Sequence, residues 1–397
     1  MSVPAASSAV SNDAPHRLLV VDDNEMNRDM LSRRLQRQGF RVDTAENGQQ
    51  ALDAITASAY DLVLLDIMMP VMNGYDLLAR LKGDAVLRHI PVIMITAVDD
   101  IESVARCIEL GAEDHLPKPF NPVILRARVD SALAKKRLRD REQIHAKSLE
   151  RELNIGRQIQ ASFLPESLPQ GPGWELAAQF QPARQVAGDF YDAFILPDGR
   201  IALVVADVCD KGVGAALFMA LFRSLIRVLA AQNCAEPEPA TVLVRTMGSI
   251  NDYIAQTHSS ANMFATVFFG VLSPASGELH YVNAGHDAPA IVAPGAQAPL
   301  RLAPTGPAVG LMAGQDFRCE STPLAPGALL LAFTDGVTDA GGPAGQMFGE
   351  ERLLGLLDSG PHATAAATLE RIAAALAAHV ADAPRFDDIT LLAVRRG

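Results

Sequence analysis

Short, almost continuously apolar runs alternate with amphipathic helical patterns over the first third of the chain. The apolar runs are RLLVV (residues 17–21), DLVLL (61–65) and PVIMI (91–95), and such runs are typical of parallel strands that are covered on both faces. The helical patterns between them end at Gly39 and Gly111, which suit the left-handed residue after a helix. Alternation at this spacing predicts a doubly wound α/β domain over residues 16–135.

The pattern changes twice in the rest of the chain. Residues 135–152 are dense in charges of both signs and lack glycine and proline, which predicts an exposed helix with i,i+4 ion pairs. Its apolar positions keep only a loose heptad, so a coiled-coil homodimer and a monomeric connecting helix both stay open for the linker, residues 136–170. From Trp174 onward β-rich segments surround an alanine-rich helical run, which predicts an α+β domain over residues 171–397.

Charge and composition narrow the function classes. The formal net charge of −12 argues against nucleic-acid binding, which needs a basic face. The four cysteines form no CxxC pair, and this fits buried thiols in a reducing cytoplasm. Residues 1–15 have neither the basic start nor the apolar core of a secretory signal peptide. We expect this segment to be disordered. Apolar stretches such as residues 215–222 fall short of the roughly 18 residues of a membrane span, so we expect a cytoplasmic protein without a membrane partner.

Polar side chains follow the predicted parallel strands of the first domain. Asp22 and Asp23 end the first strand and Asp66 ends a later one. Thr96 and Lys118 follow two further strands, and carboxyl ends of parallel strands meet at one edge. Carboxylates that share a site repel one another, and a hard cation such as Mg²⁺ relieves the repulsion. Asp66 can then attack phosphorus as a nucleophile, while Thr96 and Lys118 hold the phosphoryl oxygens.

Residues 17–135 resemble a bacterial two-component receiver domain. The segments VVDDN, LLDIMMPVMNGYD, MITA and LPKPF match its motifs in order and spacing. The resemblance implies a flavodoxin-like fold and phosphorylation of Asp66 by a sensor histidine kinase or a phosphotransfer protein. It also implies one Mg²⁺, with the ligands Asp22, Asp23, Asp66 and the backbone carbonyl of Met68.

The same resemblance assigns the switch residues of the receiver. Thr96 and Lys118 would hold the phosphoryl group, and the Lys118–Pro119 bond would be cis. His115 stands where the family usually has tyrosine or phenylalanine. We therefore expect signalling by burial of an aromatic side chain to be weaker here, or to depend on pH.

Four acidic corners lie beside apolar strands of the C-terminal region. They are VAGDFYD, VVADVCDKG, LAFTDGVTD and RFDDIT, with Asp189, Asp207, Asp335 and Asp387. Carboxylates resist burial unless they are paired, hydrogen-bonded or bound to a metal. Because the corners hold no histidine and a single cysteine, Cys209, beside eight carboxylates, Mg²⁺ or Mn²⁺ is favoured over zinc. Two such ions about 3.5–4 Å apart would activate water and stabilise displacement at phosphorus. We expect Asp387 to face a metal and Asp388 to support it.

Residues 174–397 resemble the PP2C-type serine/threonine phosphatases of the sporulation and stress-response branch, which act on phosphorylated anti-sigma-factor antagonists. The segments AGDFYD, ADVCDKGVGAALFMA, NAGHDAP, TDGVTDA and FDDITLL carry the match, and RQIQASFLPESLP resembles the family's linker. The resemblance implies a β-sandwich flanked by helices and two Mn²⁺ or Mg²⁺ ions. Their ligands by position would be Asp189, Asp207, the carbonyl of Val208, Asp335 and Asp387.

The chain departs from the family pattern at two places. Ala187 replaces the first glycine of the usual Gly-Gly-Asp. The family's segment ADVSGHG reads ADVCDKG here, which places Lys211 directly before its last glycine. We expect Lys211 to be a solvated surface residue, with phosphate binding as the alternative. His286 could suggest a general acid, but a hydrogen-bonded structural histidine is the preferred interpretation.

Together these features predict a cytoplasmic response regulator. Its output would be metal-dependent hydrolysis of phosphoserine or phosphothreonine on a protein, a STAS-like anti-sigma-factor antagonist, controlled by Asp66. The alternative is a non-catalytic, receiver-gated adaptor that holds a regulatory partner. Loss of metal ligands would favour the adaptor, and all four expected carboxylates are present. The sequence does not decide the direction of regulation, the oligomeric state or the choice between Mn²⁺ and Mg²⁺.

Overall fold

The chain forms two compact units, residues 1–149 and 150–397, each with its own hydrophobic core. The structure is a computed structural model that describes residues 15–97, 101–358 and 364–397. Nearly all of the segment expected to be disordered, residues 1–15, therefore lies outside the described residues. The boundary between the units falls within the long helix α5 (Pro122–Phe163).

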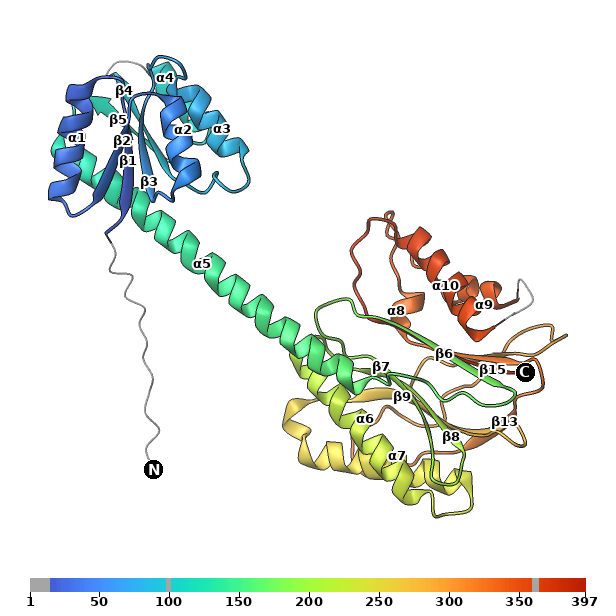
Figure 1. The fold of residues 1–397 in the computed structure, drawn as a ribbon. Helices are drawn as coiled ribbons and strands as arrows, with labels where there is room; N and C mark the ends of the chain where they lie inside the picture. The colour runs from blue at the N-terminus through green and yellow to red at the C-terminus, as the bar shows by residue number, and fades with distance from the viewer. Residues whose placement is uncertain (1–14, 98–100, 359–363) are drawn as a thin grey trace, which may run out of the picture. The chain divides into compact units, whose positions relative to one another are not determined.

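A five-stranded parallel sheet in the order β2-β1-β3-β4-β5 forms the first unit (Figure 1). Its strands are β1 (Arg17–Val21), β2 (Arg41–Ala45), β3 (Leu62–Asp66), β4 (Val92–Ala97) and β5 (Asp114–Lys118). Its helices are α1 (Glu25–Arg37), α2 (Gly48–Ala57), α3 (Gly74–Gly83) and α4 (Ile101–Glu109), together with the start of α5. Side chains of α1 and α5 pack on one face, and those of α2, α3 and α4 on the other. The doubly wound, flavodoxin-like fold is confirmed.

Asparagines begin three of these helices. The side chains of Asn24, Asn47 and Asn73 accept hydrogen bonds from backbone N–H groups in the first turns of α1, α2 and α3. Such N-caps satisfy donors that a helix leaves without partners. For α1 and α3, they fix where the chain turns back from the carboxyl edge of the sheet.

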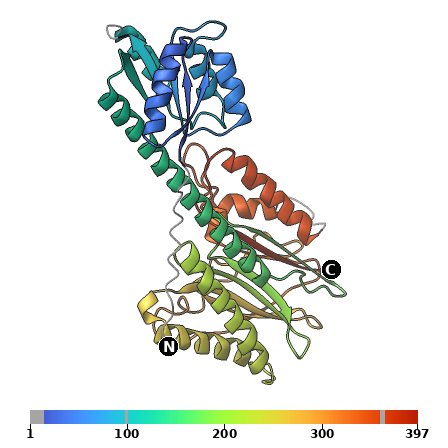
Figure 2. The ribbon, with the colours of Figure 1, turned by 60° about the vertical axis from the view of Figure 1, so that its left-hand side comes forward.

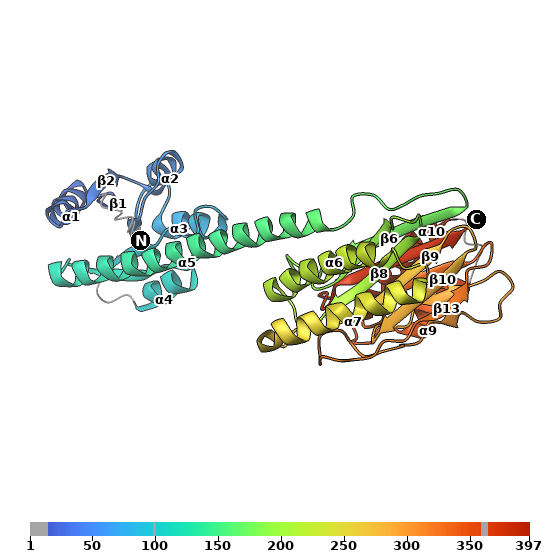
Figure 3. The same ribbon diagram turned by 90° about the horizontal axis from the view of Figure 1, so that it is seen from below.

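Helix α5 is 42 residues long and is continuous through residues 122–163 (Figure 3). Leu125, Val129 and Leu133 are buried against the receiver sheet. Further along, Leu138, Ile144, Leu149, Ile155 and Ile159 are exposed. The helix thus begins earlier than the charged segment from which the sequence predicts it.

Two five-stranded antiparallel sheets pack together in the second unit, in the orders β13-β10-β9-β8-β7 and β12-β11-β14-β15-β6. The first sheet has β7 (Phe190–Ile195), β8 (Ile201–Val208), β9 (Ala265–Ser273), β10 (Glu278–Ala284) and β13 (Glu320–Pro323). The second has β6 (Trp174–Gln181), β11 (Ala290–Val292), β12 (Leu300–Arg301), β14 (Leu329–Phe333) and β15 (Ile389–Arg396). The helices are α6 (Val213–Asn233), α7 (Pro239–Thr257), α8 (Asp335–Thr338), α9 (Glu350–Asp358) and α10 (Ala365–Val380), with a 3₁₀ turn at Ser259–Ala261.

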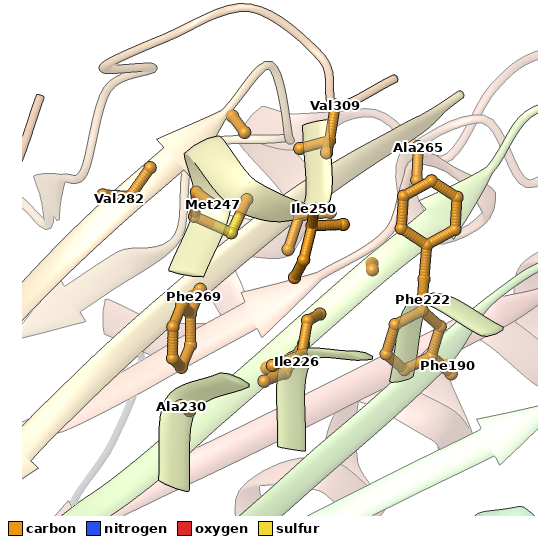
Figure 4. Close-up of a cluster of buried hydrophobic side chains, with 14 of the residues drawn as sticks. Phe190, Phe222, Ile226, Ala230, Met247, Ile250, Ala265, Phe269, Val282 and Val309 are labelled. Carbon is orange, nitrogen blue, oxygen red and sulfur yellow. The ribbon is translucent and has the colours of Figure 1, made fainter. Parts of the chain in front are cut away.

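Helices cover both outer faces of this sandwich (Figure 2). Figure 4 shows Phe222 and Ile226 of α6 and Met247 and Ile250 of α7 packed against the first sheet, with Phe269 of β9. Helices α9 and α10 pack on the second sheet. The predicted β-sandwich flanked by helices is confirmed.

Within the described ranges, one helix, α6, is long and apolar enough to cross a membrane by length and composition alone, with a mean hydropathy of 1.8. Core helices pass the same test, and α6 contributes Phe222 and Ile226 to the core of the second unit. Its Arg223 and Arg227 form ion pairs with the buried Asp192 of β7. Both the packing and the ion pairs are those of a core helix.

Candidate functional site

Three carboxylates gather at the carboxyl edge of the receiver sheet. Asp22, Asp23 and Asp66 each offer an oxygen within 4.8 Å of the others, with Asp22 and Asp66 buried. The Nζ of Lys118 lies 3.1 Å from Asp22 Oδ2 and 2.9 Å from Asp66 Oδ1. Burial raises the pKa of Asp66 above its ordinary value; Lys118 opposes this and Asp22 adds to it. An all-oxygen donor set of this size suits a hard divalent cation.

The remaining receiver residues surround this group. Thr96 is buried at the end of β4, and its Oγ1 has no hydrogen-bond partner within the described residues. A buried hydroxyl without a partner is costly, and a phosphoryl oxygen would satisfy it. Met68, in the loop after β3, is exposed, and His115 is half-buried with Nδ1 3.7 Å from Asp114 Oδ1. The Lys118–Pro119 bond is cis, as the resemblance implied.

Four acidic side chains of the second unit come from both sheets. Asp189 directly precedes β7 and Asp207 lies in β8, in the first sheet; Asp335 begins α8 after β14, and Asp387 precedes β15, in the second. Burial raises the pKa of Asp189 well above its ordinary value, and the neighbouring Asp207 raises it further. Burial and the charge of Asp335 raise the pKa of Asp207 to about 7. The carboxylates are therefore close enough to repel one another strongly.

Two glycines let these corners approach. A Cβ on Gly336 would lie 1.9 Å from the carbonyl oxygen of Asp388 and 3.3 Å from Cβ of Asp387. A Cβ on Gly188 would lie 2.7 Å from the carbonyl oxygen of Val208. Side chains at either position would push the loops apart, so the glycines bring Asp335 beside Asp387 and the Asp189 loop beside Val208.

Two buried threonines hold Asp189. Thr334 Oγ1 donates to Asp189 Oδ2 at 2.6 Å and Thr390 Oγ1 donates to the same oxygen at 2.7 Å. The sequence interpretation did not predict a role for either threonine. Their positions in the acidic motifs could have indicated one, since Thr334 directly precedes Asp335 and Thr390 ends the FDDIT segment.

Asp388 supports the loop before Asp189. Its buried carboxylate accepts hydrogen bonds from the backbone N–H of Ala183 at 2.7 Å and of Gly188 at 2.9 Å. Burial nevertheless raises the pKa of Asp388, against these hydrogen bonds. The two adjacent aspartates thus differ in burial: Asp388 is buried among backbone donors, whereas Asp387 is half-exposed.

Family models match both units. The model for Stage II sporulation protein E (SpoIIE) matches residues 197–397, half of the chain, and the response regulator receiver domain model matches residues 18–130. The chain belongs to the SpoIIE family. It carries a receiver domain before the SpoIIE-family domain, and it is thus a response regulator with a phosphatase-type output domain.

Individual relatives match part of the chain. Protein IcfG of Synechocystis is 44% identical over 264 residues, covering 62% of this chain and 41% of that protein. Response regulator PleD of Caulobacter vibrioides is 31% identical over 63% of this chain and 58% of that protein. The chain therefore spans 41–58% of the length of these two relatives. The SiaA-PP2C domain of Pseudomonas aeruginosa matches with a TM-score of 0.54 and 24% identity, over 64% of this chain and 98% of that chain, which shows a common fold.

Lys211 of the SpoIIE-family domain is about one-third exposed and also forms an ion pair that the sequence did not predict. Its Nζ lies 2.8 Å from Asp387 Oδ2 and donates to the carbonyl oxygen of Phe386 at 2.6 Å. The ion pair joins the loop after β8 to the loop before β15. A sequence pattern cannot show such a contact, because it depends on how the two sheets pack.

Two further groups flank the acidic corners. Asp287 was not predicted, although it lies in NAGHDAP; burial raises its pKa, and Asp335 and Asp339 raise it further. His286 is buried, with Nδ1 2.8 Å from Thr266 Oγ1, and burial lowers its pKa to about 4. His286 is therefore neutral at pH 7 and hydrogen-bonded, as expected of a structural histidine.

The donor set of the SpoIIE-family domain fits divalent cations. It consists of carboxylates and a backbone carbonyl; burial and, after it, the charge of Asp335 raise the pKa of Asp207, and a bound cation would favour the ionised form. Among the described residues, the receiver trio is the group whose three ligand atoms lie within 4.8 Å of one another. The carboxylates of the SpoIIE-family domain are spread more widely, over the ends of two sheets. A cavity of about 190 Å³ lies beside them, lined in part by Gly336, Arg385, Phe386 and Asp387.

Proposed function

We propose that this response regulator hydrolyses phosphoserine or phosphothreonine on a protein in a reaction that requires Mn²⁺ or Mg²⁺. The observation that carries the proposal is the convergence of Asp189, Asp207, Asp335 and Asp387, with the pKa of Asp207 raised to about 7. Like charges are costly to hold together in a partly buried site. Bound cations would remove this repulsion, and its removal would contribute to the free energy of metal binding.

The proposed ligand roles follow the family pattern. Asp207 would bridge two ions, with the Val208 carbonyl on one of them. Asp335 and Asp387 would bind the other, and Asp189 would bind directly or through water. The bound ions would act as Lewis acids and lower the pKa of water. The protein's own residues then position the ligands and orient the phosphoryl group, which would enter by the cavity beside Asp387.

We further propose that the receiver controls this activity. Asp66 would accept a phosphoryl group from a histidine kinase or a phosphotransfer protein, with one Mg²⁺ on Asp22, Asp23, Asp66 and the Met68 carbonyl. Thr96 Oγ1, which lacks a partner in the described structure, would donate to the phosphoryl group. The added charge would redirect Lys118 from its two carboxylates.

The substrate we propose is a phosphorylated, STAS-like anti-sigma-factor antagonist in the cytoplasm. The working domain limits are 16–135 for the receiver, 136–170 for the linker and 171–397 for the phosphatase. A homodimer through the exposed apolar positions of α5 would carry the signal. Equal turnover of the substrate by Asp66→Ala and by beryllofluoride-treated wild type would contradict this coupling.

Phosphate release from a small aryl phosphate tests the catalytic proposal. Wild type is assayed with Mn²⁺ or EDTA, with and without beryllofluoride on the receiver. We expect Mn²⁺-dependent turnover that Asp387→Asn abolishes and that Asp382→Asn, at an exposed aspartate nearby, retains. No turnover by wild type in any of these states would support the adaptor alternative instead.

A further inference from the structure

Three cavities adjoin one another around the segment that leads into Asp387. The central cavity, of about 190 Å³, lies beside Asp387 itself. It shares Val380 and Arg385 with a cavity of about 320 Å³ between helix α10 and strands β6 and β15. It shares Pro384 and Phe386 with a third cavity, of about 610 Å³. We call the three cavities together the flanking groove, with the acidic site at its centre.

Two consecutive side chains of this segment line opposite parts of the groove. Phe386 lines the cavity of about 610 Å³, and Arg385 lines the cavity beside α10, while both line the central cavity. The chain therefore presents an aromatic ring on one side of Asp387 and a guanidinium group on the other. A ligand that reaches Asp387 along the groove would meet both.

The part of the groove that Phe386 lines is suited to an apolar side chain. Phe386 and Met347 both line it, with 71% and 66% of their surfaces exposed. Exposed side chains of these two types are enriched where proteins bind one another. Asp339 and Asp382 line the same cavity, so an acidic group would be repelled there.

The part of the groove that Arg385 lines is suited to an acidic side chain. Arg385 is exposed, and in the described ranges of the chain no carboxylate pairs with it. Gln179 and Gln181 of β6 line the same cavity. A guanidinium group binds a carboxylate through two parallel hydrogen bonds. The charges on the two sides of Asp387 thus favour different neighbours of a bound phosphoryl group.

We propose that the flanking groove binds the segment of a phosphoprotein on either side of its phosphorylated residue, with an apolar side chain beside Phe386 and an acidic one beside Arg385. This inference rests on the proposed function, since it places the phosphoryl group in the central cavity. Phe386 and Arg385 are then specificity-determining residues. They contact the neighbours of the phosphoserine or phosphothreonine, which a small phosphate ester lacks.

Peptide binding to the full chain with Mn²⁺, with and without beryllofluoride, tests the proposal. The probes are short labelled peptides that contain the phosphonate analogue of phosphoserine, which cannot be hydrolysed, so that binding is measured whether or not the protein is active. They differ only in the two flanking residues: leucine then glutamate, glutamate then leucine, or glycine on both sides. The variants are Phe386→Ala and Arg385→Gln. The matched controls are Ile195→Ala and Arg318→Gln, at exposed positions outside the groove.

We expect one of the two leucine and glutamate peptides to bind wild type about tenfold more tightly than the glycine peptide, by fluorescence anisotropy. Phe386→Ala should remove most of this preference, and Arg385→Gln should reduce it about threefold. Both controls should keep it, and affinity for the glycine peptide should stay unchanged in all variants.

Three results would overturn the proposal. The first is equal affinity of wild type for the three peptides, or no binding of any, in both receiver states. The second is a preference that both Phe386→Ala and Arg385→Gln retain in full. The third is a loss of affinity in Phe386→Ala that is as large for the glycine peptide as for the preferred one.

The two proposals fail in different ways. If wild type prefers one flanked peptide but releases no phosphate from an aryl phosphate, the flanking groove stands and the catalytic activity fails. If wild type releases phosphate and binds the three peptides equally, the activity stands and the flanking groove fails.

Discussion

The receiver and the SpoIIE-family domain both gather aspartates, but they treat the charge differently. In the receiver, Lys118 lies within 3.1 Å of both buried carboxylates, Asp22 and Asp66. In the SpoIIE-family domain, Asp189 and Asp207 form no ion pair in the described part of the chain, and the pKa of Asp207 rises to about 7. The Lys118 ammonium group neutralises part of the receiver's negative charge even when no metal is bound. The buried carboxylates of the other site lack such a partner within the described residues, so their ionised forms depend on cations from solution.

The largest effect expected from this contrast is the pH dependence of the free energy of unfolding in the absence of metal. The folded-state pKa of Asp207, about 7, exceeds its ordinary value of 3.8, so the protonated form is favoured by folding. Its contribution is fully present below about pH 4 and is lost as the pH rises through 7. In EDTA, raising the pH from 5 to 8 should lower the free energy of unfolding by roughly 3 kcal/mol.

Urea unfolding of wild type and Asp207→Asn at several pH values measures this effect. The difference between the two proteins isolates Asp207 from other titrating groups. We expect the decrease in wild type only, and saturating Mn²⁺ should remove it. The difference in unfolding free energy between wild type and Asp207→Asn in EDTA should change between pH 5 and pH 8. The same difference at both pH values would contradict the account.

Removing the positive charge of Lys118 should make the receiver site resemble the acidic site of the SpoIIE-family domain. Lys118→Met leaves Asp22 and Asp66 without their ion-pair partner, at a cost of about 2 kcal/mol at pH 7.5 in EDTA. Mg²⁺ should then stabilise the variant more than it stabilises wild type. Thermal unfolding with and without Mg²⁺ measures this, with Lys147→Met, at an exposed lysine, as control. Equal Mg²⁺ stabilisation of all three proteins would argue against the role of Lys118.

A smaller effect is expected from the hydrogen bonds that orient Asp189. Thr334→Val keeps the shape of the side chain but removes a donor to Asp189 Oδ2. Mn²⁺ affinity should fall about tenfold, measured by calorimetry beside Thr257→Val, an exposed control. A variant that binds Mn²⁺ as tightly as wild type would show that Asp189 needs no such orientation.

The smallest effect is expected at Lys211. Its ion pair with Asp387 is about one-third exposed on both sides, and such pairs contribute at most about 1 kcal/mol. Lys211→Gln should therefore tighten Mn²⁺ binding by less than about fivefold. A larger gain in affinity would mean that Lys211 is a true counter-ion, and that the two sites are more alike than proposed.

The sequence predicted both folds because each depends on local patterns. Continuous apolar runs in 17–21 and 61–65 became buried parallel strands, and β-rich segments after Trp174 became the sandwich. Motif spacing led to the acidic residues that the structure brings together at each sheet edge. The roles of these residues as metal ligands stay predictions.

Contacts between distant segments could not be predicted. Lys211 with Asp387 and the threonines with Asp189 both join parts of the chain that meet only when strands and helices pack. No local periodicity encodes them, and the early start of α5 was hidden because its first turns are buried on the receiver sheet.

The most direct measurement is Mn²⁺ titration calorimetry at pH 7.5 on the full chain with Asp22→Asn and Asp66→Asn. The account predicts that this protein still binds Mn²⁺ and releases protons on binding, since Asp207 titrates near 7. Adding Asp207→Asn should remove both signals. No Mn²⁺ binding by the chain that lacks the Asp22 and Asp66 carboxylates, or binding that survives Asp207→Asn unchanged, would contradict the claim that the carboxylates of the SpoIIE-family domain are held for divalent cations.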